Sequence, residues 1–173
     1  MSLNLSHSNP EWSLGELSQA DLTEVRRLAD AAPQGDNDVP ITRLAEEMAG
    51  EHKSGWVSIE NRRAVGVFGK NGCLLGVGCA TPGAEGIACE GYISRVYVAP
   101  EARGNGLGVA IAEALEAILV GEGCSRAWLY CWSGIPQSVA FWSRRGFVRM
   151  GTVACDEGWV LRMIKLLPVS GRQ

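Results

Sequence analysis

The sequence from Val96 to Gly108 passes directly from a β-branched strand, through a glycine-rich loop, into a helix with regularly spaced apolar residues. The first amide groups of a helix have no partner within it, and the aligned peptide dipoles place partial positive charge there, which favours a phosphate group. Gly104, Gly106 and Gly108 allow positive φ angles and lack the Cβ atoms that would keep a ligand away. Arg103 adds a cation. The stretch predicts an anion site, the simpler alternative being a strand-to-helix turn with surplus glycine.

Two common phosphate-binding motifs do not fit this loop. The dinucleotide fingerprint G-x-G-x-x-G, counted from Gly104, requires glycine where the chain has Val109. A Walker loop requires Gly-Lys followed by Ser or Thr, which the chain does not contain. A nucleotide-dependent regulator is therefore disfavoured. The pattern that the loop does show is Arg-x-x-Gly-x-Gly, from Arg103 to Gly108.

This pattern resembles the loop that binds the acyl-CoA pyrophosphate in the GCN5-related N-acetyltransferase (GNAT) superfamily. Two further segments are similar to the same family. Arg95–Glu101 is similar to its fourth strand and the exit from it, and Ala140–Phe147 to its fourth helix and the Gly-Phe pair that follows. The resemblance covers the chain from Ala64 to Leu167. It implies an α/β fold whose central mixed sheet is flanked by helices and splays open between its fourth and fifth strands.

The composition is that of a single globular domain. With 173 residues, 46% apolar and 20% charged, the chain is long enough to bury a core. We expect one domain over residues 11–168, a disordered segment 1–10 and a tail 169–173. The net charge of −3 disfavours a nucleic-acid or membrane partner, because such partners are bound by clustered Lys and Arg. Residues 1–10 are polar and no apolar run is long enough to span a bilayer, so neither a secretory signal nor a membrane helix is expected.

The six cysteines are spaced in a way that favours neither disulfide bonds nor a metal site. No C-x-x-C motif occurs, and most of the cysteines lie in apolar stretches where a free thiol packs as a small hydrophobic group. His7 and His52 are far from them in sequence. We expect free thiols, no metal and a reducing cytoplasm.

Apolar periodicity and turn residues divide the chain into strands and helices. The expected strands are residues 12–17, 65–69, 73–80, 87–98, 127–132, 147–153 and 159–166. A first helix is expected after Ser18, and the others are 41–49, 107–120 and 137–145. Ser18 and Asp21 match a helix-capping pattern. Asn71-Gly72 predicts a hairpin turn because both residues tolerate positive φ, and residues 51–63 stay ambiguous between helix and loop.

The resemblance also implies a cofactor site. Strands that separate lose their ladder partners, and a pantetheine arm would replace them along the backbone of the opened strand. The loop and helix start would bind the pyrophosphate. The expected cofactor contacts are Val96, Tyr97, Val98, Arg103, Gly104, Asn105, Gly106, Leu107, Gly108 and Trp142. Core packing of the two valine side chains is compatible with this role of their backbone.

The reaction implied is direct attack of an amine on the thioester of acetyl-CoA, with no metal. The amine must lose a proton, the oxyanion needs a donor and the leaving thiolate needs a proton. The family's proton donor is typically a tyrosine four residues before the Gly of the Gly-Phe pair, where this chain has Trp142. An indole N–H is too weak an acid for this role. Solvent is an alternative donor, because a thiolate with a pKa of about 8.5 is a fair leaving group.

The remaining catalytic candidates are Glu90, Tyr92 and Tyr130. Glu90, or else Tyr92, is the candidate base, the alternative for Glu90 being an ordinary surface carboxylate. Tyr92, Tyr97 and Tyr130 are candidate acids, each with a purely structural alternative. The family's Asn before the fourth helix is also absent, with Ile135 near its place.

These residues favour an acetyl-CoA-dependent N-acetyltransferase that acts on a primary amine of a small molecule or peptide. The alternative is a CoA-binding sensor or pseudoenzyme that keeps the loop without turnover. Similar proteins often form dimers, so a homodimer is a further expectation. The second half of the chain is rich in tryptophans that either line an acceptor pocket or pack in the core: Trp128, Trp132, Trp142 and Trp159.

Overall fold

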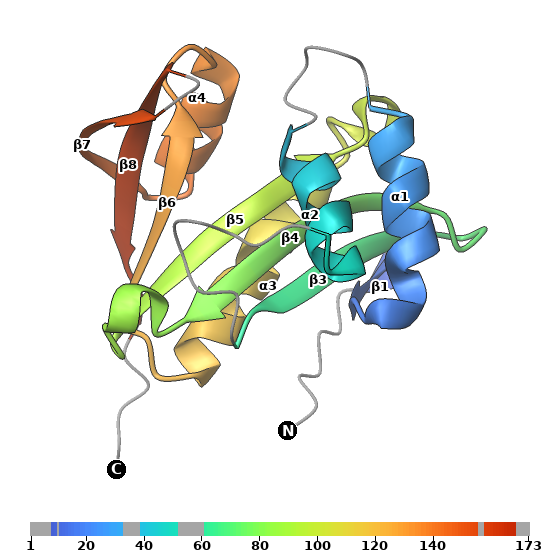
Figure 1. Cartoon of the computed structure of the whole chain (residues 1–173), viewed down its shortest axis with the longest axis horizontal. Coiled ribbons are helices and arrows are strands. Elements are labelled where there is room, and N and C mark those ends of the chain that lie inside the picture. Colours follow the sequence, from blue (N-terminus) through green and yellow to red (C-terminus); the bar gives the residue numbers. More distant parts are fainter. Residues whose placement is uncertain (1–7, 10, 33–38, 52–60, 156–157, 169–173) are drawn as a thin grey trace.

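The computed structural model describes residues 8–9, 11–32, 39–51, 61–155 and 158–168. Within these residues eight strands form one mixed sheet in the order β1-β2-β3-β4-β5-β6-β8-β7 (Figure 1). The strands are β1 Ser8–Asn9, β2 Trp12–Glu16, β3 Arg63–Gly69, β4 Leu74–Pro82, β5 Glu90–Val98, β6 Arg126–Trp132, β7 Val148–Cys155 and β8 Gly158–Leu166. Neighbouring strands run antiparallel except β5 and β6, which run parallel. This is the mixed α/β architecture expected from the sequence.

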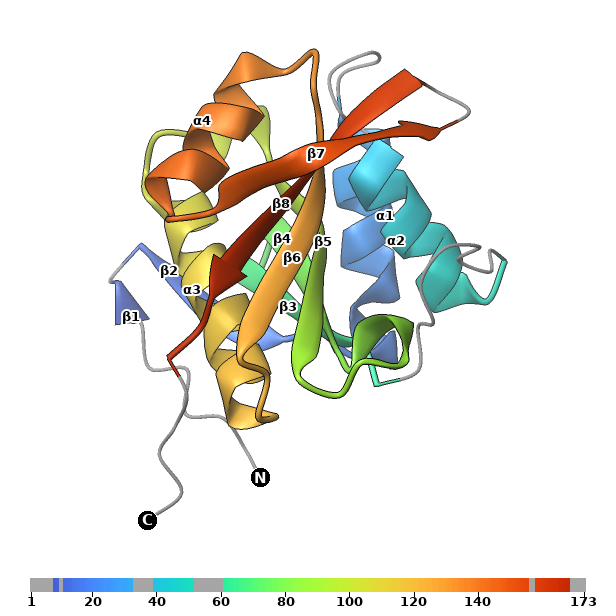
Figure 2. The same ribbon diagram turned by 90° about the vertical axis from the view of Figure 1, so that its left-hand side faces the viewer.

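Helices cover both faces of the sheet. The α-helices in the described residues are α1 Leu22–Asp30, α2 Val39–Ala49, α3 Leu107–Gly121 and α4 Pro136–Arg144. The first two, α1 and α2, pack together over one face, and α3 lies on the opposite face (Figure 2). Beside β6 lies α4, in the part of the molecule that also holds β7 and β8. Every helix in these ranges is too short or too polar to cross a lipid bilayer.

Glycines in β4 and β5 let α3 approach the sheet closely. A Cβ atom at Gly91 would lie 2.3 Å from Leu119 Cδ2, and one at Gly78 would lie 2.6 Å from Ile111 Cγ2. A side chain at either position would force Leu119 or Ile111 to move, so glycine at both positions permits the close packing. The apolar face of α3 is buried against these strands. The packing fixes the start of α3 relative to the end of β5.

The helices on the other face begin at signals present in the sequence. Asp21 accepts a hydrogen bond from the Ser18 N–H at 2.8 Å, and Ser18 Oγ accepts one from Ala20 N–H at 3.3 Å, so the predicted capping pattern is confirmed. One 3-10 turn, Gln19–Asp21, precedes α1. The second helix begins at Val39, two residues before the predicted start. Residues 52–60 of the ambiguous stretch lie outside the described residues.

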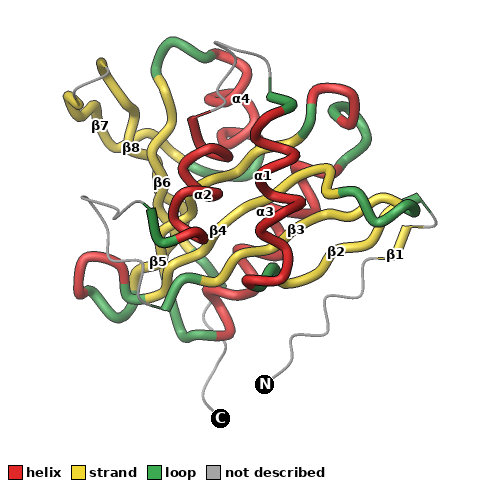
Figure 3. The backbone as a smooth tube through the Cα atoms, turned by 45° about the vertical axis from the view of Figure 1, so that its right-hand side comes forward, coloured by secondary structure: helices red, strands yellow, loops and turns green. Residues whose placement is uncertain are grey.

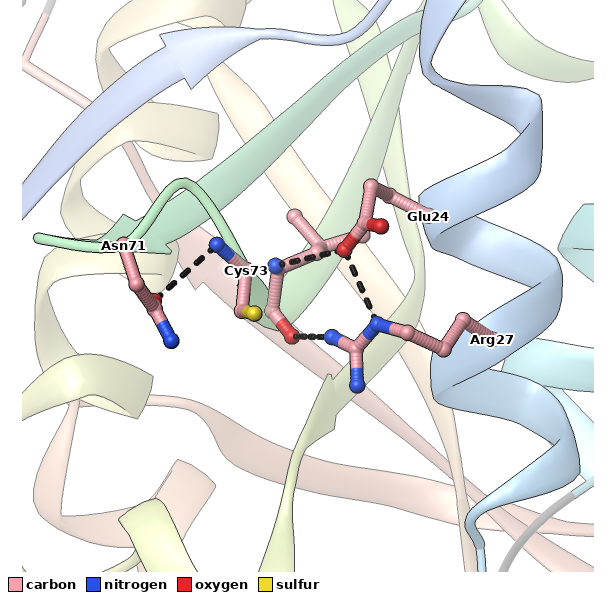
Figure 4. A network of polar contacts seen from close by, with 5 residues as sticks. Glu24, Arg27, Asn71 and Cys73 are labelled. Atoms are coloured by element: carbon pink, nitrogen blue, oxygen red, sulfur yellow. Dashed lines mark hydrogen bonds and ion pairs between the residues drawn. The ribbon is translucent and has the colours of Figure 1, made fainter.

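The hairpin between β3 and β4 is confirmed, but its turn differs from the predicted one. Gly72 has a φ of 77°, whereas Asn71 keeps a negative φ. Gly72 N–H donates to Gly69 O and Gly69 N–H donates to Cys73 O, both at 2.9 Å. The turn is therefore a three-residue loop with glycine at its last position. Asn71 contributes its side chain, because its Oδ1 accepts from Cys73 N–H at 3.1 Å (Figure 4).

A small polar network ties α1 to the start of β4 (Figure 4). The carboxylate of Glu24 accepts hydrogen bonds from Leu74 N–H at 3.2 Å and from Arg27 Nε at 2.9 Å. Arg27 Nη2 donates in turn to Leu74 O at 3.0 Å. Both backbone groups of Leu74 are thereby satisfied by one turn of helix.

The sheet opens between β5 and β6, as expected. Their pairing consists of Glu90–Arg126, Gly91–Ala127 and Tyr92–Trp128, and beyond the last pair the strands diverge (Figures 1 and 3). We call residues 93–98 of β5 and 129–132 of β6 the unpaired seam. Backbone groups along the seam lack a ladder partner from the neighbouring strand and can bind a ligand instead.

One terminal prediction needs correction. Ser8–Asn9 form a short strand paired with β2, where the sequence predicted disorder, because β2 offers them an edge of the sheet. Residues 1–7, residue 10 and residues 169–173 lie outside the described residues.

Candidate active site

The glycine-rich loop leads from β5 to the first turn of α3. Gly104 and Gly106 have φ angles of 82° and 78°, in the left-handed region that favours glycine, and Gly106 is the N-cap residue of α3. A Cβ atom at either position would have no heavy atom of the described residues within 4 Å. The loop therefore needs glycine for its backbone path and has open space beside it.

The first amides of α3 are available as hydrogen-bond donors. The first bond of the helix runs from Ala110 N–H to Gly106 O at 3.0 Å. The N–H groups of Leu107, Gly108 and Val109 precede it and have no acceptor within the helix. Leu107 is buried, which anchors this turn. Such a helix start suits the predicted diphosphate.

Arg103 and Asn105 stabilise the loop itself. Arg103 Nε donates to Val98 O at 3.1 Å, and its guanidinium lies over the Tyr97 ring at 5.9 Å from the centroid. Asn105 Nδ2 donates to Ala102 O at 3.3 Å. The loop is therefore held in shape by its own residues.

A β-bulge displaces β5 along the seam. Val77 pairs with Tyr97 and Cys79 pairs with Ser94, so Gly78 faces two residues, Arg95 and Val96. Arg95 has a φ of 56°, which is unusual for a residue with a side chain. The side chains of Val96 and Val98 pack against the core. Their backbone contacts with a cofactor stay a prediction.

The structure brings the three candidate catalytic residues onto one face of the sheet. They lie at the closed end of the seam, which is the end that adjoins the paired residues of β5 and β6. Tyr92 stacks on Trp128 with ring centroids 4.3 Å apart, and Tyr130 meets the same indole edge-on at 5.4 Å. Burial raises the pKa of the Tyr92 hydroxyl group, so it stays protonated at neutral pH. Tyr92 can therefore act as a hydrogen-bond donor.

Glu90 lies one step further into the paired region. It is 7% exposed, and its carboxylate lies 3.3 Å from Arg126 Nη1 and 4.0 Å from Arg162 Nη2. The Arg162 guanidinium also lies over the Trp128 ring, 4.8 Å from its centroid. Glu90 is thus a buried, paired carboxylate and not the free surface carboxylate of the alternative interpretation.

A second group of charges lies on the same face, beneath α2. Glu47 Oε1 accepts from Arg95 Nη2 at 2.7 Å, and Glu47 also pairs with Arg62. The side chains are 3% exposed for Glu47, 15% for Arg95 and 9% for Arg62. Burial would raise the pKa of Glu47, but the hydrogen bonds and charges of Arg95 and Arg62 outweigh it and hold the pKa below its usual value. We call these three residues the charge cluster.

The charge cluster is absent from the predicted site residues. Arg95 is the one charged residue between Ile93 and Val98, and this was the signal in the sequence that could have identified it. Glu47 has the spacing of an ordinary helix surface residue, and Arg62 lies in the stretch left ambiguous. Only the tertiary packing of α2 on β5 brings them together.

The comparisons with known proteins agree with this geometry. The model of the acetyltransferase (GNAT) family matches residues 24–147. The chain belongs to this family. Among curated proteins, none matches the sequence of this GNAT domain.

Solved structures share the fold of this GNAT domain at low identity. A GNAT-family protein from Desulfovibrio desulfuricans superposes with a TM-score of 0.71 at 13% identity, over 90% of this chain and 98% of that one. A variant of spermidine N-acetyltransferase from Vibrio cholerae gives 0.66 at 18%, over 91% and 95%. Ribosomal-protein-S18-alanine N-acetyltransferase from Escherichia coli gives 0.63 at 17%, over 94% and 96%.

In this GNAT domain the position for which the family resemblance implies a tyrosine lies on α4 and is Trp142. Trp142 is 6% exposed, and its ring packs edge-on against Phe141 and Phe147, with centroids 4.9 and 5.2 Å away. The indole therefore belongs to the core, and its contact with the cofactor stays a prediction. Ile135 is the N-cap residue of α4 and makes no side-chain cap.

The other tryptophans divide between core and surface. Trp128 is fully buried, Trp132 is half-buried and Trp159 is 60% exposed. Trp128 is the one that stacks with a catalytic candidate. In the described part of the domain, no three His, Cys, Asp or Glu side chains gather as a metal-binding group.

Proposed function

We propose that the protein is an acetyl-CoA-dependent N-acetyltransferase that transfers the acetyl group to a primary amine of a small molecule or peptide by direct attack. One observation carries the proposal: β5 leaves its parallel neighbour after Tyr92 and leads, through the 3-10 turn Pro100–Ala102, to the left-handed glycines at the start of α3. An extended ligand can thus place a diphosphate at the helix and an amide-bearing arm along the strand. Acetyl-CoA has this form.

In this proposal the backbone binds and orients the cofactor. The N–H and C=O groups of Val96–Val98 that face the seam bind the pantetheine amides, and the amides of Leu107–Val109 bind the diphosphate. Acetyl-CoA supplies the thioester. A backbone N–H of β5 donates to the oxyanion. Alignment of amine and thioester can contribute up to about 7 to 11 kcal/mol.

The proton transfers are assigned to residues at the closed end of the seam. Tyr92 and Tyr130, with ring centroids 6.2 Å apart, are the proposed donors to the leaving thiolate. Glu90 is the proposed acceptor of the amine proton, through water. These roles are supported by the fact that the three residues lie on one face of the sheet. Another proton donor is needed because a buried indole occupies the position on α4 where the family resemblance implies a tyrosine.

Calorimetry with CoA and a thiol-release assay with acetyl-CoA and a broad panel of amines test the proposal. We expect CoA to bind and at least one amine to give turnover. Failure of CoA to bind would contradict the proposal. The measurement separates cofactor binding from catalysis.

The buried Trp142 favours a second function, a CoA-binding sensor without turnover. In that case CoA binds, and no amine gives thiol release even after Trp142→Tyr restores a phenol on α4. Turnover of the unmodified protein with any amine rejects the sensor. The same assay therefore decides between the two functions.

We further propose that the protein works in a reducing cytoplasm. Its six cysteines carry free thiols, which suits a compartment where disulfide bonds are rare.

Light scattering coupled to size-exclusion chromatography tests the expected homodimer.

A further inference from the structure

Within the residues that the structure describes, the charge cluster beneath α2 holds more positive than negative charge. Arg62 and Arg95 share the single carboxylate of Glu47, so these three side chains carry a net charge of +1. All three are at least four-fifths buried. A buried charge without compensation is unfavourable for folding, because it has lost its hydration. The cluster therefore favours an anion nearby.

Arg62 has one edge of its guanidinium directed away from Glu47. Its Nη1 binds Glu47, while Nε and Nη2 are buried and have no hydrogen-bond partner within the described residues. These two nitrogens form one edge of the planar group, and their parallel N–H bonds match the two oxygens of a carboxylate. A carboxylate on this edge would satisfy both donors and neutralise the cluster.

The register of the sheet connects Arg62 with the closed end of the seam. Arg63 pairs with Ala80, Thr81 pairs with Tyr92, and Tyr92 pairs with Trp128. Arg62, one residue before β3, therefore continues the row that runs through Thr81 to Tyr92. Two strand spacings, about 10 Å, separate the backbones of Arg62 and Tyr92. A small molecule can span this distance.

We infer that the acceptor is an amine that also carries a carboxylate, which binds the free edge of Arg62 while the amine reaches the seam beside Tyr92. This inference rests on the proposed acetyltransferase function. A polycationic amine is disfavoured at the same site, because the cluster repels it.

Two buried hydroxyl groups lie in this row or two residues from it along the strands. Thr81 Oγ1 and Ser94 Oγ have no hydrogen-bond partner in the described residues. Thr81 lies in the row itself, and Ser94 is adjacent to Arg95 in β5. Both hydroxyl groups can donate a hydrogen bond to the amine substrate when it is bound. The charges of Arg95, Arg62 and Glu47 also act on the pKa of the Tyr92 hydroxyl group, although burial has the larger effect.

The test compares carboxylates with carboxamides of the same length. Glycine, 4-aminobutanoate and 6-aminohexanoate are assayed by thiol release beside their carboxamides, with spermidine as the cationic probe. We expect kcat/KM for the acid of best-fitting length to exceed that of its amide by about ten- to a hundredfold, the value of a charged hydrogen bond. Spermidine is expected to be the poorest substrate. Equal rates for acids and amides, or a preference for spermidine, overturn the inference and leave the proposed function intact.

Two arginine variants locate the effect. Arg62→Lys keeps the charge but loses the flat edge, so the preference for the acid should disappear through KM, with CoA affinity unchanged. Arg63→Lys is the matched control, because Arg63 pairs instead with Glu16 and Glu122 and should keep the preference. Retention of the full preference by Arg62→Lys contradicts the inference. If Arg62→Lys does not fold, the comparison of acids and amides in the unmodified protein still tests the inference.

Binding provides a readout that does not depend on turnover. The same acids and amides are titrated by calorimetry into protein saturated with CoA. Acids that bind more tightly than their amides support the inference even if no amine is acetylated, an outcome that would reject the proposed function alone. Absence of binding by every acid rejects the inference.

Discussion

Glu47 in α2 holds Arg95 in β5 through two hydrogen bonds, from Nη2 to Oε1 at 2.7 Å and from Nε to Oε2 at 3.3 Å. Arg95 is the bulge residue whose φ of 56° is unfavourable for a side-chain-bearing residue. The contact therefore stabilises the backbone shape of β5 along the seam. It also joins α2 to the strand that is proposed to bind the cofactor.

Glu47→Gln should be strongly destabilising. The change leaves two largely buried guanidinium groups without a counter-charge, and removal of one partner from a buried ion pair costs about 3 to 5 kcal/mol. Urea denaturation followed by circular dichroism measures the effect. Glu51→Gln is the control, because Glu51 pairs with Arg26 at the surface and should change stability by less than about 1 kcal/mol. Equal effects of the two substitutions would contradict the assignment.

The contribution of Glu47 should depend on pH. Its pKa in the folded protein is below the usual value, while in the unfolded chain it titrates near about 4.3. Between these values the unfolded chain binds more protons, so the stabilisation is complete at neutral pH and is lost as pH falls through the folded pKa. We expect the difference in unfolding free energy between wild type and Glu47→Gln to shrink below pH about 4. A constant difference from neutral to acid pH would disprove this.

Gly106→Val should strongly weaken CoA binding. The residue at the N-cap of α3 has a φ of 78°, which a β-branched side chain does not tolerate, and its Cβ would enter the open space beside the loop. We expect the affinity measured by calorimetry to fall by more than about tenfold, or about 1.4 kcal/mol. Gly121→Ala, at the other end of α3 with open space around it, is the control. Unchanged affinity of Gly106→Val would count against the loop assignment.

Trp142 should matter for folding more than for proton transfer. Trp142→Ala removes a buried ring and should cost about 3 to 5 kcal/mol. Trp142→Phe should retain most of kcat, whereas Tyr92→Phe and Tyr130→Phe should lower it by up to about a hundredfold. Thiol-release kinetics measure the three variants. A loss in Trp142→Phe as large as in Tyr92→Phe would assign chemistry to the indole.

Cys79 should resist alkylation in the native protein. Burial raises the pKa of its thiol to about 12, so almost no reactive thiolate forms at pH about 8. Cys155 is only half-buried and serves as the internal comparison. Peptide mapping by mass spectrometry after iodoacetamide treatment measures both. Labelling of Cys79 at the rate of Cys155 without unfolding would show that its site opens.

Features that depend on neighbouring residues were predictable from the sequence. The positive φ of Gly104 and Gly106, the Ser18–Asp21 cap and the β3–β4 hairpin each follow from residues within a few positions of one another. The opening of the sheet between these two strands was implied by the family resemblance and not by any local pattern, and the structure locates it after Tyr92.

Features that depend on packing were not predictable. Glu47 and Arg95 are separated by 48 positions, and no periodicity relates a helix residue to a distant strand residue. The bulge at Arg95 arises because β4 and β5 differ in length between two fixed pairs. Trp142 shows the same limit: its place in the sequence indicates a family position, but the neighbouring rings decide that it is buried.

The unpaired seam also bears on self-association. Backbone groups without a ladder partner are those through which β-proteins aggregate edge to edge. Here such groups lie inside the sheet, between β5 and β6, rather than along its rim. The fold thus keeps unpaired strand backbone accessible to a narrow ligand. The same groups are shielded from pairing with whole strands of other molecules.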